Sequence, residues 1–159
     1  MGGVFLEVGN VTPLAEANVY GDPIASKIVF HQAKNLFIFP LNVTNKAVLT
    51  PNVFDYIQAN SKNPSHTIMK PMYDYYFSAY QKLNPSIEGP LLHDVVAISG
   101  LVNQSFFEFA HRTVNVDTYG DTKGQTFADF RPNSKSEGAR IALEIDAEKF
   151  IQDFIKIML

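Results

Sequence analysis

The polar residues best suited to chemistry near the start of the chain lie at residues 9–18. There Asn10, Thr12, Glu16 and Asn18 combine amide, hydroxyl and carboxylate groups. Such groups can bind a polyhydroxylated ligand, because each hydroxyl of that ligand both donates and accepts hydrogen bonds. The same residues can instead cap a turn, with Asn10 and Thr12 bonding the local backbone. Residues 9–18 therefore predict either a polar binding crevice or a capped turn.

A second candidate site is the pair His93 and Asp94, which follows the Gly-Pro-Leu-Leu turn at residues 89–92. A histidine at a helix start can act as a general acid, since its ordinary pKa is close to the working pH. An aspartate there can bind a hard cation through oxygen. The alternative is that Asp94 caps the helix and His93 is a surface side chain. The other three histidines are interpreted as structural.

Two tyrosines form a third candidate. Tyr76 and Tyr80 lie one turn apart on the same face of a helix expected over residues 66–82. A pair of rings at this spacing usually packs in the core. On a helix that follows a flexible loop, the pair could also close over a flat ring by stacking.

The elements that must position these residues alternate between strands and helices. The apolar run at residues 36–39 predicts a strand buried on both faces, with residues 4–8 as its partner strand. Helix signals and apolar spacings predict helices at residues 23–33, 51–58, 66–82, 95–101 and 147–159. Extended segments are expected at residues 106–109, 112–118 and 142–145, with a hairpin through the turn at 119–124 into 125–130.

This alternation predicts an α/β fold, with a mainly parallel sheet, flanking helices and a late antiparallel hairpin. The length of 159 residues favours a single domain over residues 1–159. Ligands in such folds bind at the carboxyl ends of the strands. The loops at residues 9–18 and 40–44 are therefore the expected place for chemistry.

The composition argues against several classes of protein and of functional site. The chain has 13 Lys+Arg and 16 Asp+Glu, a net charge of -3 and no basic run, which argues against nucleic-acid binding. The absence of Cys excludes a disulfide framework, a thiolate zinc site and a cysteine nucleophile. No apolar run approaches the roughly 20 residues of a spanning helix, and the first residues do not resemble a signal peptide. We therefore expect a cytoplasmic protein with no membrane association.

Six motifs in order resemble the inosine-uridine preferring nucleoside hydrolases. They are Gly9-Asn-Val-Thr-Pro-x-Ala-Glu-x-Asn18, Asp22-Pro23, Pro40-Leu-Asn-Val-Thr44, Leu49-Thr-Pro51, Gly89-Pro-Leu-x-His-Asp94 and a Gly-x-x-x-Gly-x-Thr turn before Asp129. Each motif alone is weak. Six in sequence are specific, and they cover nearly the whole chain.

The resemblance implies a calcium-dependent hydrolase that cleaves the N-glycosidic bond of purine and pyrimidine ribonucleosides, as in nucleoside salvage. By that likeness His93 protonates the leaving base and Asp94 is one calcium ligand. The residues expected to contact the substrate are the ribose-binding Asn10, Glu16 and Asn18, the base-covering Tyr76 and Tyr80, and Met1 at the sugar pocket. A carboxylate such as Glu16 can also stabilise the oxocarbenium-like transition state.

The chain also departs from the family pattern. Family members are about twice as long, and their initial Asp-x-Asp-x-x-x-Asp-Asp run, which supplies most calcium carboxylates and the base for water, is absent here. Asn42, Ala17 and Val95 replace the family's Asp, Phe and Pro, which suggests relaxed constraint at the site. The chain thus resembles a carboxyl-terminal half of the enzyme, impaired alone.

Two functional hypotheses follow from the half-length match. One is a nucleoside hydrolase whose site is completed by other residues. The other is a non-catalytic module that binds ribose or nucleosides, or that assembles with a separately encoded amino-terminal half. Because half of the sheet would be missing, we also expect an exposed strand edge and a homo-oligomer that covers it.

Overall fold

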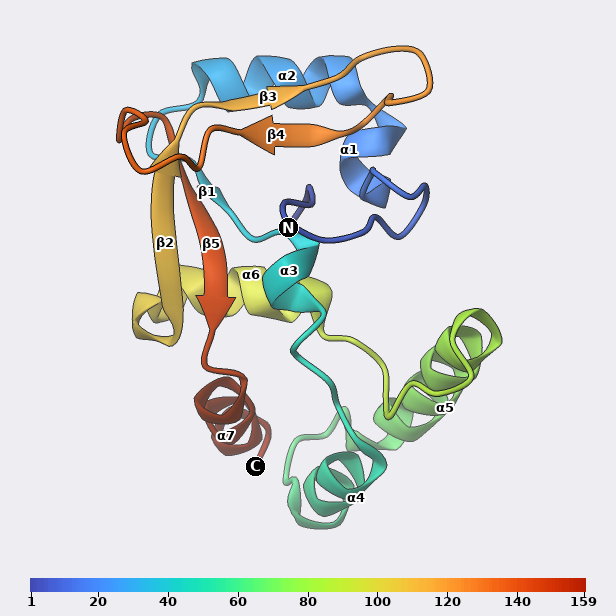
Figure 1. Ribbon diagram of the computed structural model, residues 1–159. Coiled ribbons are helices and arrows are strands. Elements are labelled where there is room, and N and C mark those ends of the chain that lie inside the picture. The colour runs from blue at the N-terminus through green and yellow to red at the C-terminus, as the bar shows by residue number, and fades with distance from the viewer.

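The computed structural model describes residues 1–159 (Figure 1). Seven α-helices are present, namely α1 (Ala17–Gly21), α2 (Pro23–Gln32), α3 (Leu41–Thr44), α4 (Pro51–Asn60), α5 (His66–Leu83), α6 (His93–Val102) and α7 (Ala147–Met158). The strands are β1 (Phe37–Ile38), β2 (Phe107–Arg112), β3 (Val114–Val116), β4 (Thr126–Ala128) and β5 (Ala139–Ile145). A short 3₁₀ turn at Gln104–Phe106 leads into β2.

The strands form two small sheets. The first has the order β1-β5-β2, with β1 parallel and β2 antiparallel to β5. The second is the antiparallel pair β3-β4. The α/β class and the late hairpin are thereby confirmed. The parallel part of the sheet is the single β1–β5 pair, which is less than the mainly parallel sheet that the sequence predicts.

Both faces of the three-stranded sheet are buried. Along β5 the side chains alternate between two apolar clusters, so that Ile141 packs with Phe5 and Ile38 on one face. Ala142 packs with Phe39 and other residues on the opposite face. Burial on both faces explains why the residues around β1 are apolar without alternation, although β1 lies at the edge of this sheet.

Residues 4–8 do not form the predicted strand, and β1 pairs with β5 instead. The apolar side chains of Val4 and Phe5 are buried in the core without belonging to a strand. The backbone of Val4 is paired with a side chain: its N–H donates to Thr126 Oγ1 at 2.9 Å, and the Thr126 hydroxyl donates to its carbonyl at 2.6 Å. At Leu6 the φ angle is 59°, so the chain turns away. Residues 4–8 therefore have the apolar sequence typical of a buried strand, although the backbone of Val4 bonds to a side chain and not to a neighbouring strand.

The other boundaries agree closely with the sequence predictions. The helices expected at residues 23–33, 51–58 and 66–82 end within two residues of the observed α2, α4 and α5. The strands differ more, since β2 extends to residue 112 and β5 begins at residue 139. No helix is both long enough and apolar enough to cross a membrane.

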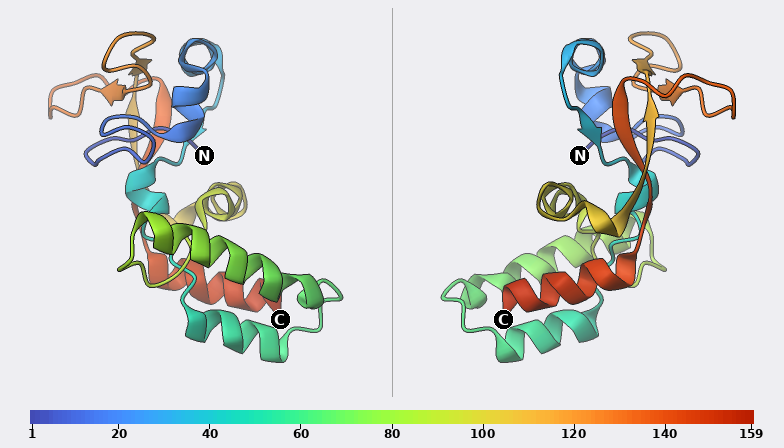
Figure 2. Two further views of the ribbon diagram at one scale, coloured as in Figure 1. Left: turned by 90° about the vertical axis from the view of Figure 1, so that its right-hand side faces the viewer. Right: turned by 90° about the vertical axis from the view of Figure 1, so that its left-hand side faces the viewer.

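The helices α4, α5 and α7 lie side by side at the end of the molecule opposite α2 and the hairpin (Figure 2). Tyr73 fixes α5 in this layer. Its ring stacks on Phe54 of α4 at a centroid distance of 4.0 Å, and its hydroxyl donates to the carbonyl of Leu49 at 3.1 Å. Burial and the nearby charges of Asp55 and Asp74 raise the pKa of Tyr73 to about 12. A neutral, buried anchor thus holds the helix that carries Tyr76 and Tyr80.

Candidate functional site

His93 is held by a side chain from a different helix. It is the first residue of α6, and its Nδ1 lies 2.7 Å from Oγ1 of Thr44, the last residue of α3. Thr44 is fully buried, whereas His93 is half-buried. The alternative of a simple surface histidine is therefore wrong, since one ring nitrogen is fixed in the interior.

The surroundings of His93 favour its neutral form. Burial lowers the pKa of His93 below its ordinary value, and the carboxylates of Asp94 and Glu16 oppose this shift in part. Glu16 precedes α1 and is far from His93 in sequence. Its charge acts on the His93 ring because the fold places the start of α1 near the start of α6. Burial and the two carboxylates thus act in opposite directions on the protonation of a candidate general acid.

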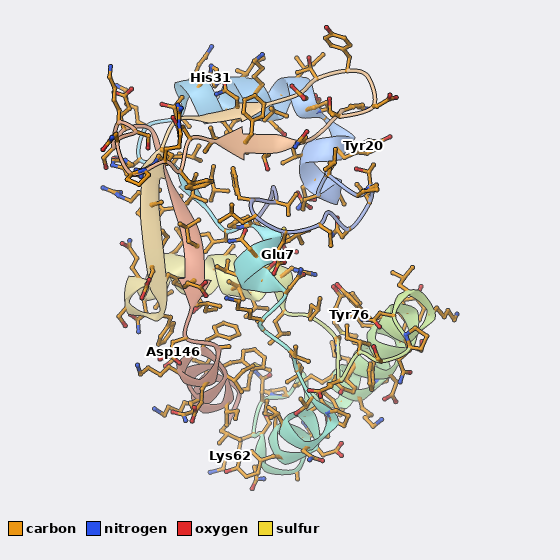
Figure 3. The ribbon with its side chains drawn as sticks, in the orientation of Figure 1. Glu7, Tyr20, His31, Lys62, Tyr76 and Asp146 are labelled. Carbon is orange, nitrogen blue, oxygen red and sulfur yellow. The ribbon has the colours of Figure 1, made fainter.

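Two tyrosines of α5 extend the site. The Tyr80 ring lies 6.3 Å from the His93 ring, centroid to centroid, with 34° between the planes. Its hydroxyl lies 3.2 Å from that of Tyr76, and the two tyrosine rings meet edge to face at 4.9 Å. Figure 3 shows Tyr76 on the side of α5 that is turned toward α6. Tyr76 is 44% exposed, so the alternative of a core position is wrong for this ring.

The same geometry changes the acidity of Tyr80. Burial is the largest cause that raises its pKa far above the ordinary value, followed by the hydrogen bond with Tyr76 and the charge of Asp94. The Tyr80 hydroxyl therefore stays protonated throughout the physiological range. Its ring presents a neutral surface beside His93, which suits stacking on a flat ligand.

Glu16 is a buried carboxylate that organises the backbone. It is 1% exposed and precedes α1, where its Oε1 accepts a hydrogen bond from the N–H of Asn18 at 2.7 Å. Its Oε2 accepts from the N–H of Gly3 at 2.9 Å and of Val19 at 3.2 Å. An ionised carboxylate offers about four acceptor positions, so three backbone bonds leave roughly one for a ligand.

The three other substrate-binding candidates lie around Glu16. Asn18 Nδ2 is 3.4 Å from both the carbonyl oxygen and the sulfur of Met1. The Oδ1 of Asn10 accepts from the N–H of Ala17 at 3.0 Å, so this residue also stabilises the loop as a turn cap. The capped turn is therefore present, and the binding crevice at residues 9–18 stays a prediction.

The candidate substrate-binding residues line two separate pockets, not one closed pocket. Met1 and Asn18 line a pocket of about 320 Å³ beside α2. Tyr76 lines a separate apolar pocket of about 430 Å³ against α4 and the loop before α6. His93 lines neither of them.

A divalent metal finds few ligands in this chain. Asp94 is exposed in the first turn of α6, and it does not cap the helix, because Leu92 occupies the cap position. No group of three or more His, Asp or Glu side chains could hold a metal ion. Both oxygens of Glu16 already accept backbone hydrogen bonds. Calcium prefers about six to eight oxygens, so the residues present do not fit a calcium ion by themselves.

Thr44 belongs to the site, although no individual role was predicted for it from the sequence. Its segment, residues 40–44, was expected near the chemistry because it follows a buried strand. The signal that could have identified Thr44 is a buried threonine at the carboxyl end of that strand, a position from which a hydroxyl reaches the ligand edge of the sheet.

Comparison with known proteins gives a consistent result. The family model for inosine-uridine preferring nucleoside hydrolase matches residues 1–152. The inosine-uridine preferring nucleoside hydrolase of Crithidia fasciculata is 32% identical over 152 residues, covering 94% of this chain and 47% of that protein. Uridine nucleosidase 1 of Arabidopsis thaliana is 32% identical over 130 residues, covering 81% of this chain and 38% of that protein.

Solved structures extend the match to the fold. The purine-preferring ribonucleoside hydrolase from Gardnerella vaginalis superposes with a TM-score of 0.89 at 29% identity, covering 99% of this chain and 50% of that one. The chain spans about half the length of the relatives it matches. It belongs to the inosine-uridine preferring nucleoside hydrolase family.

Proposed function

We propose that this chain provides the ribose-facing and base-facing residues of a ribonucleoside hydrolase, which cleaves the N-glycosidic bond to give a base and ribose. The observation that supports it best is the fixed His93 ring, which is bonded to Thr44 and lies beside Tyr80. A titratable group next to a stacking surface is the arrangement that a departing nucleobase requires.

Each residue has a proposed task. Asn10, Asn18 and the remaining acceptor position of Glu16 bind the ribose hydroxyls, with Met1 against the sugar. Tyr76 and Tyr80 cover the base, and His93 donates a proton to it as the bond from the sugar carbon to the base nitrogen breaks. The negative charge of Glu16 stabilises the positive charge that develops on the sugar.

The chemistry is incomplete within this chain. Water must be activated for attack on the sugar. Of the carboxylates near His93, Asp94 is proposed as a metal ligand and both oxygens of Glu16 accept backbone hydrogen bonds, so neither is assigned that task. Asp94 contributes two oxygens at most, far fewer than calcium needs, so the other calcium ligands and the general base must come from residues outside those described here. We propose that a second polypeptide segment supplies them, either an amino-terminal half or a neighbouring subunit in a homo-oligomer. We also propose that the complete enzyme acts in the cytoplasm, in purine and pyrimidine salvage.

A second candidate function is a non-catalytic module that binds ribose or nucleosides. It is favoured by one observation, the lack of any group of three metal-binding side chains. The ribose-facing residues can bind a ligand without a metal, because their contacts are hydrogen bonds.

The deciding experiment measures release of free base from inosine and from uridine by the purified chain. The assay is run with calcium and then with a chelator, for the wild type, for His93→Ala and for His31→Ala. His31 is an exposed histidine on α2, at the other end of the molecule (Figure 3), and is the matched control. Base release that requires calcium, and that only His93→Ala lowers, would support the hydrolase. No turnover by a folded chain that binds ribose, both alone and after mixing with the separately expressed amino-terminal half of a related hydrolase, would favour the binding module.

A further inference from the structure

The hydroxyl of Thr44 has a single partner. Thr44 is fully buried, and its side chain makes one hydrogen bond, to His93 Nδ1. A threonine in a helix often donates to the carbonyl four residues earlier. Here that carbonyl, of Pro40, already accepts from the N–H groups of Val43 and Thr44 at 3.1 Å each. The hydroxyl hydrogen of Thr44 therefore has no acceptor other than the imidazole.

This environment fixes the direction of the hydrogen bond. If Nδ1 carried the hydrogen, it would donate to Thr44 and leave the buried hydroxyl hydrogen without an acceptor, which is costly. If Thr44 donates to a bare Nδ1, the hydroxyl donor and the ring nitrogen are both satisfied. The neutral ring of His93 then carries its hydrogen on Nε2, the nitrogen on the side away from Thr44.

We propose that Thr44 is the positioning residue of this site, holding the neutral His93 ring in the Nε2–H tautomer so that a hydrogen-bond donor faces the base of the bound substrate. Proton transfer to the leaving base requires the imidazolium, which carries a hydrogen on both ring nitrogens, so Thr44 acts on the neutral ring before that step. The importance of this for catalysis rests on the proposed function, whereas the tautomer itself does not. The other polar groups around the ring are Tyr80 from α5, Asp94 from α6 and Glu16 from the start of α1. None of their side chains is hydrogen-bonded to the ring, so Thr44 alone selects the tautomer.

A second histidine provides an internal reference. Nδ1 of His66 lies 2.9 Å from the carbonyl oxygen of Asn63. Because a carbonyl can only accept, the neutral His66 ring must carry its hydrogen on Nδ1. One protein thus contains both tautomers, and the ¹⁵N chemical shifts of their ring nitrogens should be reversed with respect to each other.

The test is heteronuclear NMR of the ¹⁵N-labelled chain at a pH of about 8.5, where an ordinary histidine is neutral. In the wild type we expect Nε2 of His93 to give the signal of a protonated nitrogen and Nδ1 that of a bare one, opposite to His66. A predominant Nδ1–H tautomer at His93 would overturn the proposal without any variant.

Three variants sharpen the result. Thr44→Val keeps the shape but removes the hydroxyl, and it should shift the His93 ring signals toward a mixture of tautomers. Thr44→Ser should restore the wild-type shifts. Thr113→Val, at an exposed threonine between β2 and β3, should leave them unchanged. Unaltered His66 signals show that each variant is folded, and His93 shifts that are identical in Thr44→Val and the wild type would refute the role of Thr44.

The two proposals fail separately. The NMR measurement needs no substrate and no turnover, so it gives a result even when the chain alone is inactive. Absence of base release combined with the Nε2–H tautomer would count against the hydrolase and leave the positioning role intact. Base release combined with the Nδ1–H tautomer would support the hydrolase and overturn the positioning role of Thr44.

Discussion

The carboxylate of Glu16 accepts a hydrogen bond of 2.9 Å from the backbone N–H of Gly3. This bond ties the first residues of the chain to the start of α1, and it sets Met1 next to Asn18. Glu16 is proposed to bind ribose, and it also holds the backbone of Gly3 and Asn18 in place around the proposed ribose site.

This double role predicts a structural cost for Glu16→Gln. The amide keeps one acceptor oxygen but turns an N–H₂ group toward backbone donors, so at least one buried N–H loses its partner. We expect the free energy of unfolding to fall by about 2 kcal/mol, measured by urea denaturation. An exposed control, Glu137→Gln, should change it little. Equal stability of Glu16→Gln and the wild type would contradict the backbone bonds.

The stability of the chain should depend on pH through His93. Burial lowers the pKa of His93 in the folded state below its ordinary value of 6.5. Between the folded and unfolded pKa values the unfolded chain binds more protons, so acid favours unfolding. The stabilising effect of a neutral His93 is complete above pH 6.5 and is lost as the pH falls through the folded pKa. The wild type should therefore lose more stability than His93→Gln between pH 8 and pH 5, and parallel losses in urea titrations would refute this.

The stacking role of Tyr80 can be tested by binding. Removal of an aromatic ring that stacks on a base costs roughly 1–3 kcal/mol, or about five- to a hundredfold in affinity. We expect Tyr80→Ala to weaken binding of inosine to this extent in calorimetric titrations. Tyr119→Ala is the control, since Tyr119 is 84% exposed in the turn between β3 and β4. The same loss in both variants, or in neither, would contradict the proposed contact.

Gly9 should tolerate no side chain. A Cβ at this position would lie 2.3 Å from the carbonyl oxygens of Thr12 and Ala15, so the loop must shift. We expect Gly9→Ala to lower the free energy of unfolding by about 2 kcal/mol or more. At Gly21 a Cβ meets nothing within 4 Å, so Gly21→Ala should be neutral or slightly stabilising. Thermal unfolding of the two variants gives the comparison, and an undisturbed Gly9→Ala would contradict the tight loop.

Self-association is expected through the apolar groove between α6 and α7. Ile98 and Val102 are 62% and 81% exposed, and they line this groove together with Phe154 and Ile157. Covering such a face removes apolar area from water. Sedimentation velocity at micromolar concentration should detect an oligomer that Val102→Asp dissociates. A clean wild-type monomer would refute the prediction.

The sequence predicts elements better than pairings in this protein. Caps and periodicity locate α2, α4 and α5 because these signals are local. The partner of β1 is not predictable in this way, since β5 lies a hundred residues downstream and residues 4–8 have the same apolar character. The residue types around the site could likewise be identified, but their contacts could not. The Thr44–His93 bond depends on how α3 and α6 pack, which no short-range pattern encodes.

The bonds between Val4 and the Thr126 hydroxyl join residues that are 122 positions apart. A contact of this span forms only after most of the chain has left the ribosome, because loop closure requires both ends. Val4 therefore reaches its final conformation only after Thr126 has been synthesised. Gly3 has nearer partners in Glu16 and Leu41, so β4 adds the last of the bonds that hold the segment beside Glu16.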